Sequence, residues 1–309
     1  MRRKLTAAAV VAAFLSLCLS AGEALDAARG ALVLCADTIL PSLFPFFVLS
    51  ILFSRLGIPR ALGRRLGGVA GRLFGVSGPG IAALPIGLLG GYPMGAACIA
   101  ELLARREIDE AEAERLLLFA NNSGPAFLIG AVGAGAFGSA RAGLLLWLSH
   151  AAAAALTGLL TRRREGGAQS AAKGSAPEPF AAAFPAAVRQ AVSAALTVCG
   201  FVVCFSVLLG LTELWGVPAL LRLDTQERRA LFYGFFEIGS AVGALRGLSP
   251  SPAHLALAAA IHGWGGLSVH CQTAALFCES PVSLRSHTLG RLCSALLSAG
   301  IAWALASLL

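Results

Sequence analysis

Seven apolar runs, each about as long as a bilayer is thick, constrain this chain more than any other feature. Of its 309 residues, 57% are apolar and 13% are charged, and a helix needs about 20 apolar residues to cross the hydrocarbon core. We therefore predict an all-α polytopic membrane protein. The predicted spanning helices cover residues 5–21, 31–54, 116–138, 142–160, 187–212, 254–278 and 288–309, and two shorter or broken runs cover 74–98 and 231–245.

The charge pattern predicts how the chain is oriented. The net charge of +8 does not indicate a nucleic-acid partner, because the arginines cluster in short loops between apolar runs, where they set membrane orientation. Arg2, Arg3 and Lys4 place the N-terminus in the cytoplasm by the positive-inside rule. Residues 22–30 would then form a short external loop, and the basic linker 161–186 would return to the cytoplasm as a flexible connection.

Two further patterns bear on processing and redox chemistry. The eight cysteines fall in or beside apolar runs and form no CxxC pair, so we interpret them as small buried side chains. Residues 1–24 have the charged start and apolar core of a signal peptide, but Gly22–Ala24 makes a poor cleavage site. An uncleaved first helix within an N-terminal segment 1–30 is the favoured interpretation.

The run 74–98 is predicted to enter and leave the membrane on one side. The arginine-rich loop 55–72 is predicted to be cytoplasmic, like the linker. Two cytoplasmic loops require an even number of crossings between them, yet three apolar runs lie between these two. Pro85, Gly90–Gly91 and Pro93 interrupt the first of these runs. Broken backbone at membrane depth survives only where protein or water satisfies its polar groups, so we expect a buried re-entrant hairpin.

The second half of the chain repeats the plan of the first. Residues 231–245 are too short to span and correspond to the 74–98 hairpin, and a polar-interrupted helix and a final helix follow in both halves. With a cytoplasmic linker the two repeats, 31–160 and 187–309, run in opposite directions. Inverted repeats whose interrupted helices meet near the midplane form a recurring architecture of secondary transporters.

The strongest polar interruption is Asn121-Asn122-Ser123-Gly124-Pro125. Asn122 or Ser123 would serve as a cap for a helix beginning near Pro125, which is the simplest structural account. Capping explains one polar residue better than three. We therefore favour a binding role, because three polar side chains must face protein, water or ligand at this depth.

Glu237 is a carboxylate in an apolar hairpin with no charged neighbour before Arg246. Such a group is costly unless it is paired, protonated or solvated, and we predict that it binds a cation or exchanges a proton rather than forming a structural pair. The matching position of the first hairpin holds Gly91 and Tyr92, whose hydroxyl would reach the same cavity.

Ser268, His270 and Gln272 interrupt the run 254–278. On a regular helix Ser268 and Gln272 share a face that His270 does not. A zinc site from His262, His270 and Cys271 lacks a recognisable ligand spacing, and a catalytic serine lacks the GxSxG context. We therefore expect no enzyme, no metal and no cofactor beyond a coupling cation or proton.

Two other stretches receive structural interpretations. Residues 101–117, rich in both charge signs, are predicted to form a solvated helical hairpin whose second helix starts at Asp109. The GxGxxG at 133–138 follows no strand, so close helix packing explains it better than dinucleotide binding.

Taken in order, GYPMGA, NNSGP, FFEIGSAVGAL and GLSVHCQ resemble the sporulation integral membrane protein family of the YlbJ type, over about residues 31–309. That resemblance implies a multi-pass protein of endospore-forming bacteria with a nucleoside-recognition (Gate) domain, similar to parts of concentrative nucleoside transporters. The motif positions carried over as a substrate-binding set are Gly91, Tyr92, Asn121, Asn122, Ser123, Gly124, Glu237, Ser268, His270 and Gln272.

Two hypotheses for function follow. The first is a transporter or permease of a small polar solute in the cytoplasmic membrane, coupled to an ion through Glu237. The second is a membrane scaffold or assembly factor for the spore envelope, in which the polar cluster only locks the two halves together. The expected partners are the lipid bilayer and the solute, and a homo-oligomer or spore-envelope proteins remain open.

Overall fold

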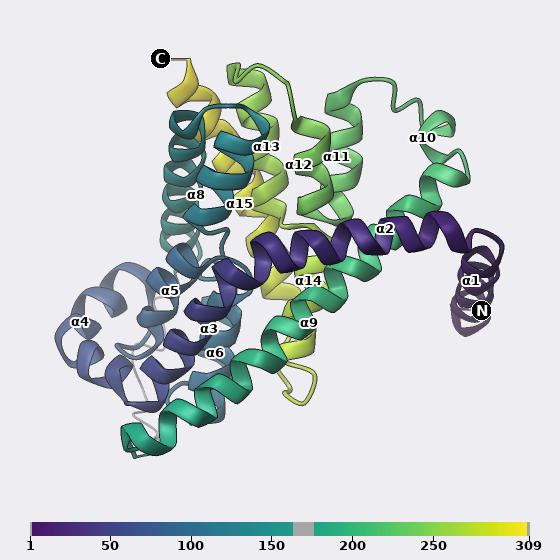
Figure 1. Ribbon diagram of the computed structural model, residues 1–309. Coiled ribbons are helices and arrows are strands. Elements are labelled where there is room, and N and C mark those ends of the chain that lie inside the picture. Colours follow the sequence, from purple (N-terminus) through teal and green to yellow (C-terminus); the bar gives the residue numbers. More distant parts are fainter. Residues whose placement is uncertain (1, 163–175, 308–309) are drawn as a thin grey trace.

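The fold was derived from a computed structural model that describes residues 2–162 and 176–307. Every regular element in these two ranges is a helix (Figure 1). Three helices, Ala140–Leu160, Phe180–Leu214 and Arg285–Ala306, are long and apolar enough to cross a membrane, and the number rises to five if each of two bent helix pairs is one span. The prediction of an all-α polytopic membrane protein is confirmed.

The first half begins with two helices that meet at a bend of 97° after Leu19, and α1 stands away from the other helices in Figure 1. A π-helical turn joins α2 to an apolar helix, α3. A basic helix, a helical hairpin, an interrupted helix and a final long helix then complete this half. The elements are α1 (Arg2–Leu19), α2 (Ala21–Leu34), η1 (Cys35–Ile39), α3 (Leu40–Arg55), α4 (Ile58–Phe74), η2 (Gly80–Ala82), α5 (Ala83–Gly90), α6 (Met94–Ala104), α7 (Glu110–Leu117), η3 (Ala126–Ala136) and α8 (Ala140–Leu160).

The second half has the same order of parts. A long helix runs diagonally across the molecule in Figure 1 and is followed by a very short helix, a hairpin, an interrupted helix and a final helix. The elements are α9 (Phe180–Leu214), α10 (Val217–Leu220), α11 (Gln226–Phe236), α12 (Ile238–Leu245), α13 (Pro252–Trp264), α14 (Gly266–Leu276) and α15 (Arg285–Ala306).

The two halves exchange helices instead of forming separate cores. One apolar core combines α5, α6 and α7 with Phe277 and Val282 from the second half. Another combines η3 and α8 with α11, α12 and α13. A third joins α2 and α3 to α9. In each half the second piece of the interrupted helix packs on the hairpin of the other half, η3 on α12 and α14 on α6, as expected for two inverted repeats.

Several predicted boundaries are wrong. Residues 22–30 are helical within α2, because their alanine-rich sequence favours helix over a loop. The linker prediction falls largely on residues 163–175, outside the described residues, and its last part is wrong because α9 already begins at Phe180. Pro85 lies in the first turn of α5 and does not interrupt it, since no intrahelical N–H bond is needed there.

The two helices predicted to be interrupted are each broken. The run 116–138 is split into α7 and η3 by residues 118–125, and the run 254–278 is split into α13 and α14 at Gly265. The hairpin 74–98 breaks at residues 91–93, between α5 and α6, and the hairpin 231–245 breaks at Glu237. Four helix breaks therefore exist, two in each half.

The stretch 101–117 is only partly solvated, contrary to its prediction. Asp109 does start α7, and its side chain accepts a hydrogen bond from the Glu112 N–H. Glu101, Arg105 and Glu107, however, are buried in a network that joins both halves at one end of the molecule. The charged members are Arg55, Glu101, Arg60, Glu107, Arg105 and Glu178.

Glu178, just before α9, is held by Arg105 at 2.7 Å and by Arg55 at 2.9 Å. These two guanidinium groups hold the pKa of the Glu178 carboxyl below its ordinary value. The folded state therefore gains stability from this carboxylate above its unfolded pKa of about 4.3, and the gain is lost as pH falls through the lower folded pKa. We expect Glu178→Gln to reduce stability by about 1 kcal/mol at pH 7, since the carboxylate is partly exposed.

The measurement is thermal unfolding of the detergent-purified wild type and Glu178→Gln between pH 7 and pH 3. The gap between the two unfolding temperatures should close as the pH drops. The pH dependence of the wild type alone would not isolate Glu178, because burial raises the pKa of the nearby Glu107 carboxyl. A raised carboxyl pKa makes stability increase as the pH falls, which is opposite to the effect of Glu178. A gap that stays constant with pH would show that Glu178 contributes nothing through its charge.

Candidate functional site

The two helix breaks of the first half, at residues 91–93 and 118–125, are in contact through the backbone of Gly91 and Gly124. Gly91 has φ 81° and ψ −177°, a conformation open essentially to glycine alone. A Cβ atom on Gly124 would lie 2.9 Å from the Gly91 nitrogen, so neither position accepts a side chain without movement. Both glycines thus have a packing role that their motif alone did not reveal.

The breaks of the second half meet in the same way, and Tyr92 links them to the first half. A Cβ atom on Gly266 would come within 3.0 Å of the Phe236 carbonyl oxygen, next to Glu237. The Tyr92 ring lies over Gly265, and its hydroxyl donates to the His262 carbonyl at 2.9 Å. All four breaks therefore converge on one region.

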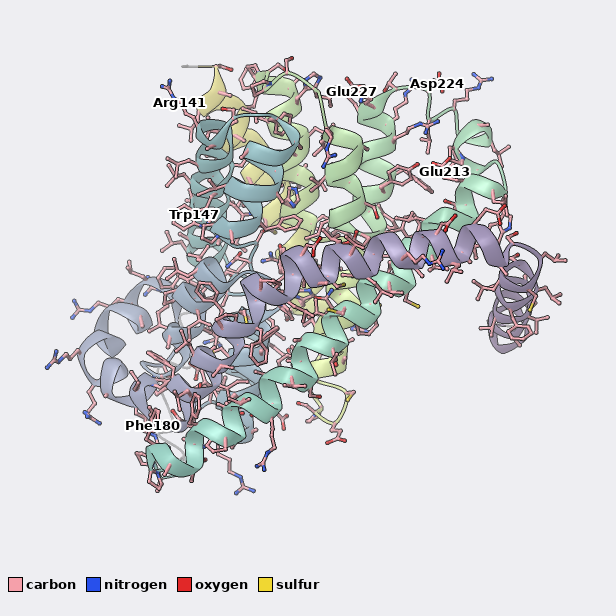
Figure 2. The ribbon with its side chains drawn as sticks, in the orientation of Figure 1. Arg141, Trp147, Phe180, Glu213, Asp224 and Glu227 are labelled. Atoms are coloured by element: carbon pink, nitrogen blue, oxygen red, sulfur yellow. The ribbon has the colours of Figure 1, made fainter. Side chains whose placement is uncertain are left out.

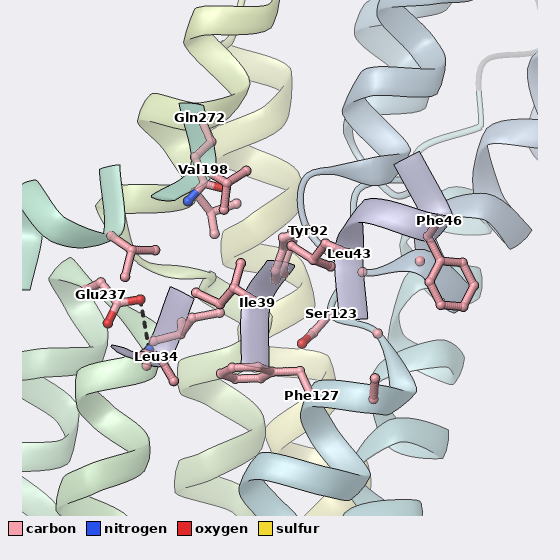
Figure 3. Close-up of a pocket in the computed structure, with 18 residues that line it drawn as sticks. Leu34, Ile39, Leu43, Phe46, Tyr92, Ser123, Phe127, Val198, Glu237 and Gln272 are labelled. Carbon is pink, nitrogen blue, oxygen red and sulfur yellow. Dashed lines mark hydrogen bonds between the residues drawn. The ribbon is translucent and has the colours of Figure 1, made fainter. Parts of the chain in front are cut away.

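A cavity of about 100 Å³ lies at this convergence (Figure 3). Six of the ten predicted binding residues line it: Gly91, Tyr92, Ser123, Gly124, Glu237 and Gln272. The remaining wall is mainly apolar and comes from α2, η1, α3, η3, α9 and α14. A cavity of about 150 Å³ accepts benzene, so this conformation has room for a few waters or a very small solute.

Asn121 and Asn122 are fully buried but do not line the cavity. Asn121 accepts from the Ala96 N–H in α6 at 3.3 Å and donates to the Thr273 hydroxyl in α14 at 3.2 Å. Asn122 donates to the Phe119 carbonyl at 2.8 Å. Neither caps η3, whose first residue is preceded by Pro125 without a side-chain cap. Asn121 instead joins the two halves.

Glu237 is 3% exposed and caps α12. Its two carboxylate oxygens accept from the Gly239 N–H at 2.9 Å and the Ser240 N–H at 2.6 Å. A negative charge is stabilised at a helix N-terminus, and this explains how an acid without a basic partner is tolerated here. The carboxylate nonetheless belongs to the cavity wall, as Figure 3 shows.

The predicted face of α14 is confirmed. Ser268 and Gln272 are both buried, and Gln272 donates to the Ser268 hydroxyl at 3.0 Å. His270 lies on another face, where its ring meets Trp264 at 4.3 Å and His287 at 4.9 Å between centroids. Within residues 2–162 and 176–307, no three His, Cys, Asp or Glu side chains are grouped to hold a metal ion.

Arg291 in α15 is a site residue that the sequence analysis missed. It is 0% exposed, and its Nη1 donates to the Tyr92 hydroxyl at 2.7 Å. Its Nε and Nη2 have no hydrogen-bond partner, and no described carboxylate forms an ion pair with it. A buried guanidinium without a counter-charge is costly and is found mainly at functional sites.

Two buried histidines lie near this guanidinium. His150 and His287 are buried and close enough to Arg291 to interact electrostatically, and both have a ring nitrogen without a partner. The other ring nitrogen of His150 accepts from the Ser123 N–H at 3.0 Å, which connects this polar cluster to the NNSGP break. Tyr92 and Ser123 line the cavity, whereas Arg291, His150 and His287 do not.

Comparison with known proteins shows which family the chain belongs to. A Bacillus subtilis (strain 168) protein, named sporulation integral membrane protein YlbJ, is 31% identical over an alignment of 300 residues. The alignment covers 86% of this chain and 74% of that protein. The chain belongs to the YlbJ family. No family model matches it, and no solved structure gives a significant match.

Membership of the YlbJ family establishes an integral membrane protein of sporulation. It does not extend to the Gate domain or to nucleoside recognition, which stay predictions. The YlbJ name also states no solute, so the chemistry of the cavity has to be argued from the residues that line it.

Proposed function

We propose that this YlbJ-family protein is a transporter of a small polar solute that operates during sporulation, with its N-terminus in the cytoplasm. The observation that carries the proposal is the meeting of four helix breaks, from both repeats, around one cavity with polar groups in its wall. Interrupted helices at a repeat interface are where secondary transporters bind their solutes. The small cavity corresponds to a closed conformation that must open for the solute to enter or leave.

The polar groups at the cavity come from opposite sides. Glu237 and Gln272 belong to the second repeat, while Ser123 and Tyr92 belong to the first (Figure 3). A solute between them would contact both repeats, and a relative movement of the repeats would then change its access. We propose no catalytic step, because the Ser268 hydroxyl is bound by Gln272 rather than by a histidine base.

The scaffold hypothesis also has a specific observation in its favour. Asn121 and Glu237 satisfy their polar groups within the protein, which is what a cluster that only locks the fold together requires. The two hypotheses differ in whether a solute binds the cavity.

Ser123 allows a direct test because its hydroxyl faces the cavity (Figure 3). Thermal unfolding of the purified protein is measured with nucleosides, amino acids, organic acids, sugars and cations, since a ligand of the native state raises its stability. We expect saturable stabilisation of the wild type and an affinity about fivefold lower for Ser123→Ala, which loses one hydrogen bond of about 1 kcal/mol.

Ser149→Ala is the matched control. Ser149 is also buried, but its hydroxyl donates to the Leu145 carbonyl within α8, away from the cavity. Its solute affinity should equal that of the wild type. Equal loss of solute affinity in both variants would show that the solute does not bind in this cavity. If the protein unfolds cooperatively and no compound changes its unfolding temperature, the scaffold hypothesis is favoured.

A further inference from the structure

Helix α4 is fixed to the molecule by one face of small and aromatic residues. Gly63 and Gly67 pack against the backbone of Gly78, and Ala70 is buried. Phe74, one turn further along this face, stacks on Phe119 with 5.5 Å between ring centroids. The orientation of α4 about its own axis is therefore set by packing.

The opposite face of α4 carries exposed arginines. Arg65 and Arg72 lie about half a turn around the helix from Gly63, and Arg64 lies about a quarter turn from each of them. None of the three forms a hydrogen bond or ion pair with a described residue, and all are exposed. Figure 2 shows side chains with nitrogen tips projecting outwards from α4. We call Arg64, Arg65 and Arg72 the arginine face.

Within residues 2–162 and 176–307, no acid forms an ion pair with the arginine face. No aspartate or glutamate occurs between Asp37 and Glu101. The nearby Glu107 pairs with Arg60, the fourth arginine of α4, at 3.5 Å. Three positive charges therefore remain for a partner outside the described chain.

The position of α4 fits the edge of a bilayer. It leaves the apolar helix 43–55 at a bend of 62°, and Figure 1 shows it at the periphery of the molecule. Ile58 and Leu73, near its two ends, are exposed apolar side chains. The corresponding helix of the second repeat, α10, has only four residues, so the repeat architecture itself does not require a basic helix here.

We propose that the arginine face binds the phosphate groups of anionic phospholipids in the leaflet where α4 lies. Guanidinium groups form strong, geometrically matched hydrogen bonds with phosphates, and each basic residue near an anionic surface contributes about 1 kcal/mol. Ile58 and Leu73 would meet the acyl chains beside these headgroups. The site is independent of solute transport and anchors one end of the first repeat to the membrane surface.

The test compares lipid-dependent stability of the full chain in detergent micelles. Phosphatidylglycerol is titrated into the wild type, into the triple variant Arg64→Gln/Arg65→Gln/Arg72→Gln, and into a control triple variant, Arg141→Gln/Arg222→Gln/Arg246→Gln. The control arginines are also exposed, and they lie at the start of α8, after α10 and after α12. We expect phosphatidylglycerol to raise the unfolding temperature of the wild type and the control saturably, with at least tenfold weaker affinity in the α4 variant.

Phosphatidylcholine is the matched lipid, and it should have little effect on any of the three proteins. All three should also unfold at similar temperatures in phosphatidylcholine micelles, because glutamine replaces only exposed side chains. Equal affinity of the α4 variant and the wild type for phosphatidylglycerol would overturn the proposal. So would stabilisation of the wild type by soluble polyglutamate but not by phosphatidylglycerol, which would point to an acidic protein partner.

Discussion

Replacing Gly95 with alanine is expected to destabilise the protein by about 3 kcal/mol, at the upper end of typical overpacking costs. A Cβ atom at this position of α6 would collide with the Ala120 carbonyl group and lie 2.8 Å from the Asn121 Cα atom. These are backbone atoms of the break between α7 and η3, which cannot yield as a flexible side chain does. The break would have to move, and its hydrogen bond from Asn121 to α14 would be lost with it.

Gly130→Ala is the control for this substitution. Gly130 is also helical, in η3, but a Cβ atom there would meet nothing within 4 Å. Alanine should therefore be neutral or stabilising by about 0.5–1 kcal/mol, through its better helix propensity. Denaturant or thermal unfolding in detergent measures both. Equal behaviour of the two variants would contradict the close packing of α6 on this break.

Replacing Arg291 with methionine is expected to leave stability unchanged or to raise it by about 1–3 kcal/mol, while abolishing stabilisation by the solute. Methionine removes a buried charge that has one hydrogen bond and no carboxylate partner. Exchange of buried charges for apolar residues of similar volume is often neutral or stabilising. Solute binding should fail because Arg291 positions Tyr92 in the cavity wall.

Arg105→Met provides the contrast, because Arg105 is a buried arginine with partners. It pairs with Glu178 at 2.7 Å and Glu107 at 3.8 Å, and its removal leaves a buried carboxylate less compensated. The expected loss is about 3–5 kcal/mol. The unfolding temperatures of Arg291→Met and Arg105→Met are compared with that of the wild type. A loss for Arg291→Met as large as that for Arg105→Met would show that Arg291 is a structural residue.

The sequence predicted the position of the site better than its contacts. Glycine, proline and polar residues in apolar runs predicted the helix breaks, because backbone at membrane depth must be satisfied by protein or water. The α14 face followed from helical periodicity alone. The contacts of Asn121 did not, since its partners, Ala96 and Thr273, are brought together only by the exchange of helices between halves.

Arg291 escaped the sequence analysis for a physical reason. It stands near the start of the apolar run 288–309, where an arginine is normally read as an interfacial residue that reaches the headgroups. In the structure α15 already begins at Arg285, so Arg291 lies well inside the helix. The opposite error was made for the charged stretch 101–107, which was predicted to be solvated. Mixed charges predict a solvated surface unless their partners elsewhere in the chain are known.

The exchange of helices between the halves also sets an order for biosynthesis. The core around α6 and α7 needs Phe277 and Val282, which are made about 160 residues after Leu117. At synthesis rates of about 5–20 residues per second, the first hairpin waits roughly 10–30 s for these partners. During that interval the polar break at Gly91–Pro93 and the NNSGP segment are already made but lack their final neighbours. Membrane insertion of this chain must therefore precede the completion of its core.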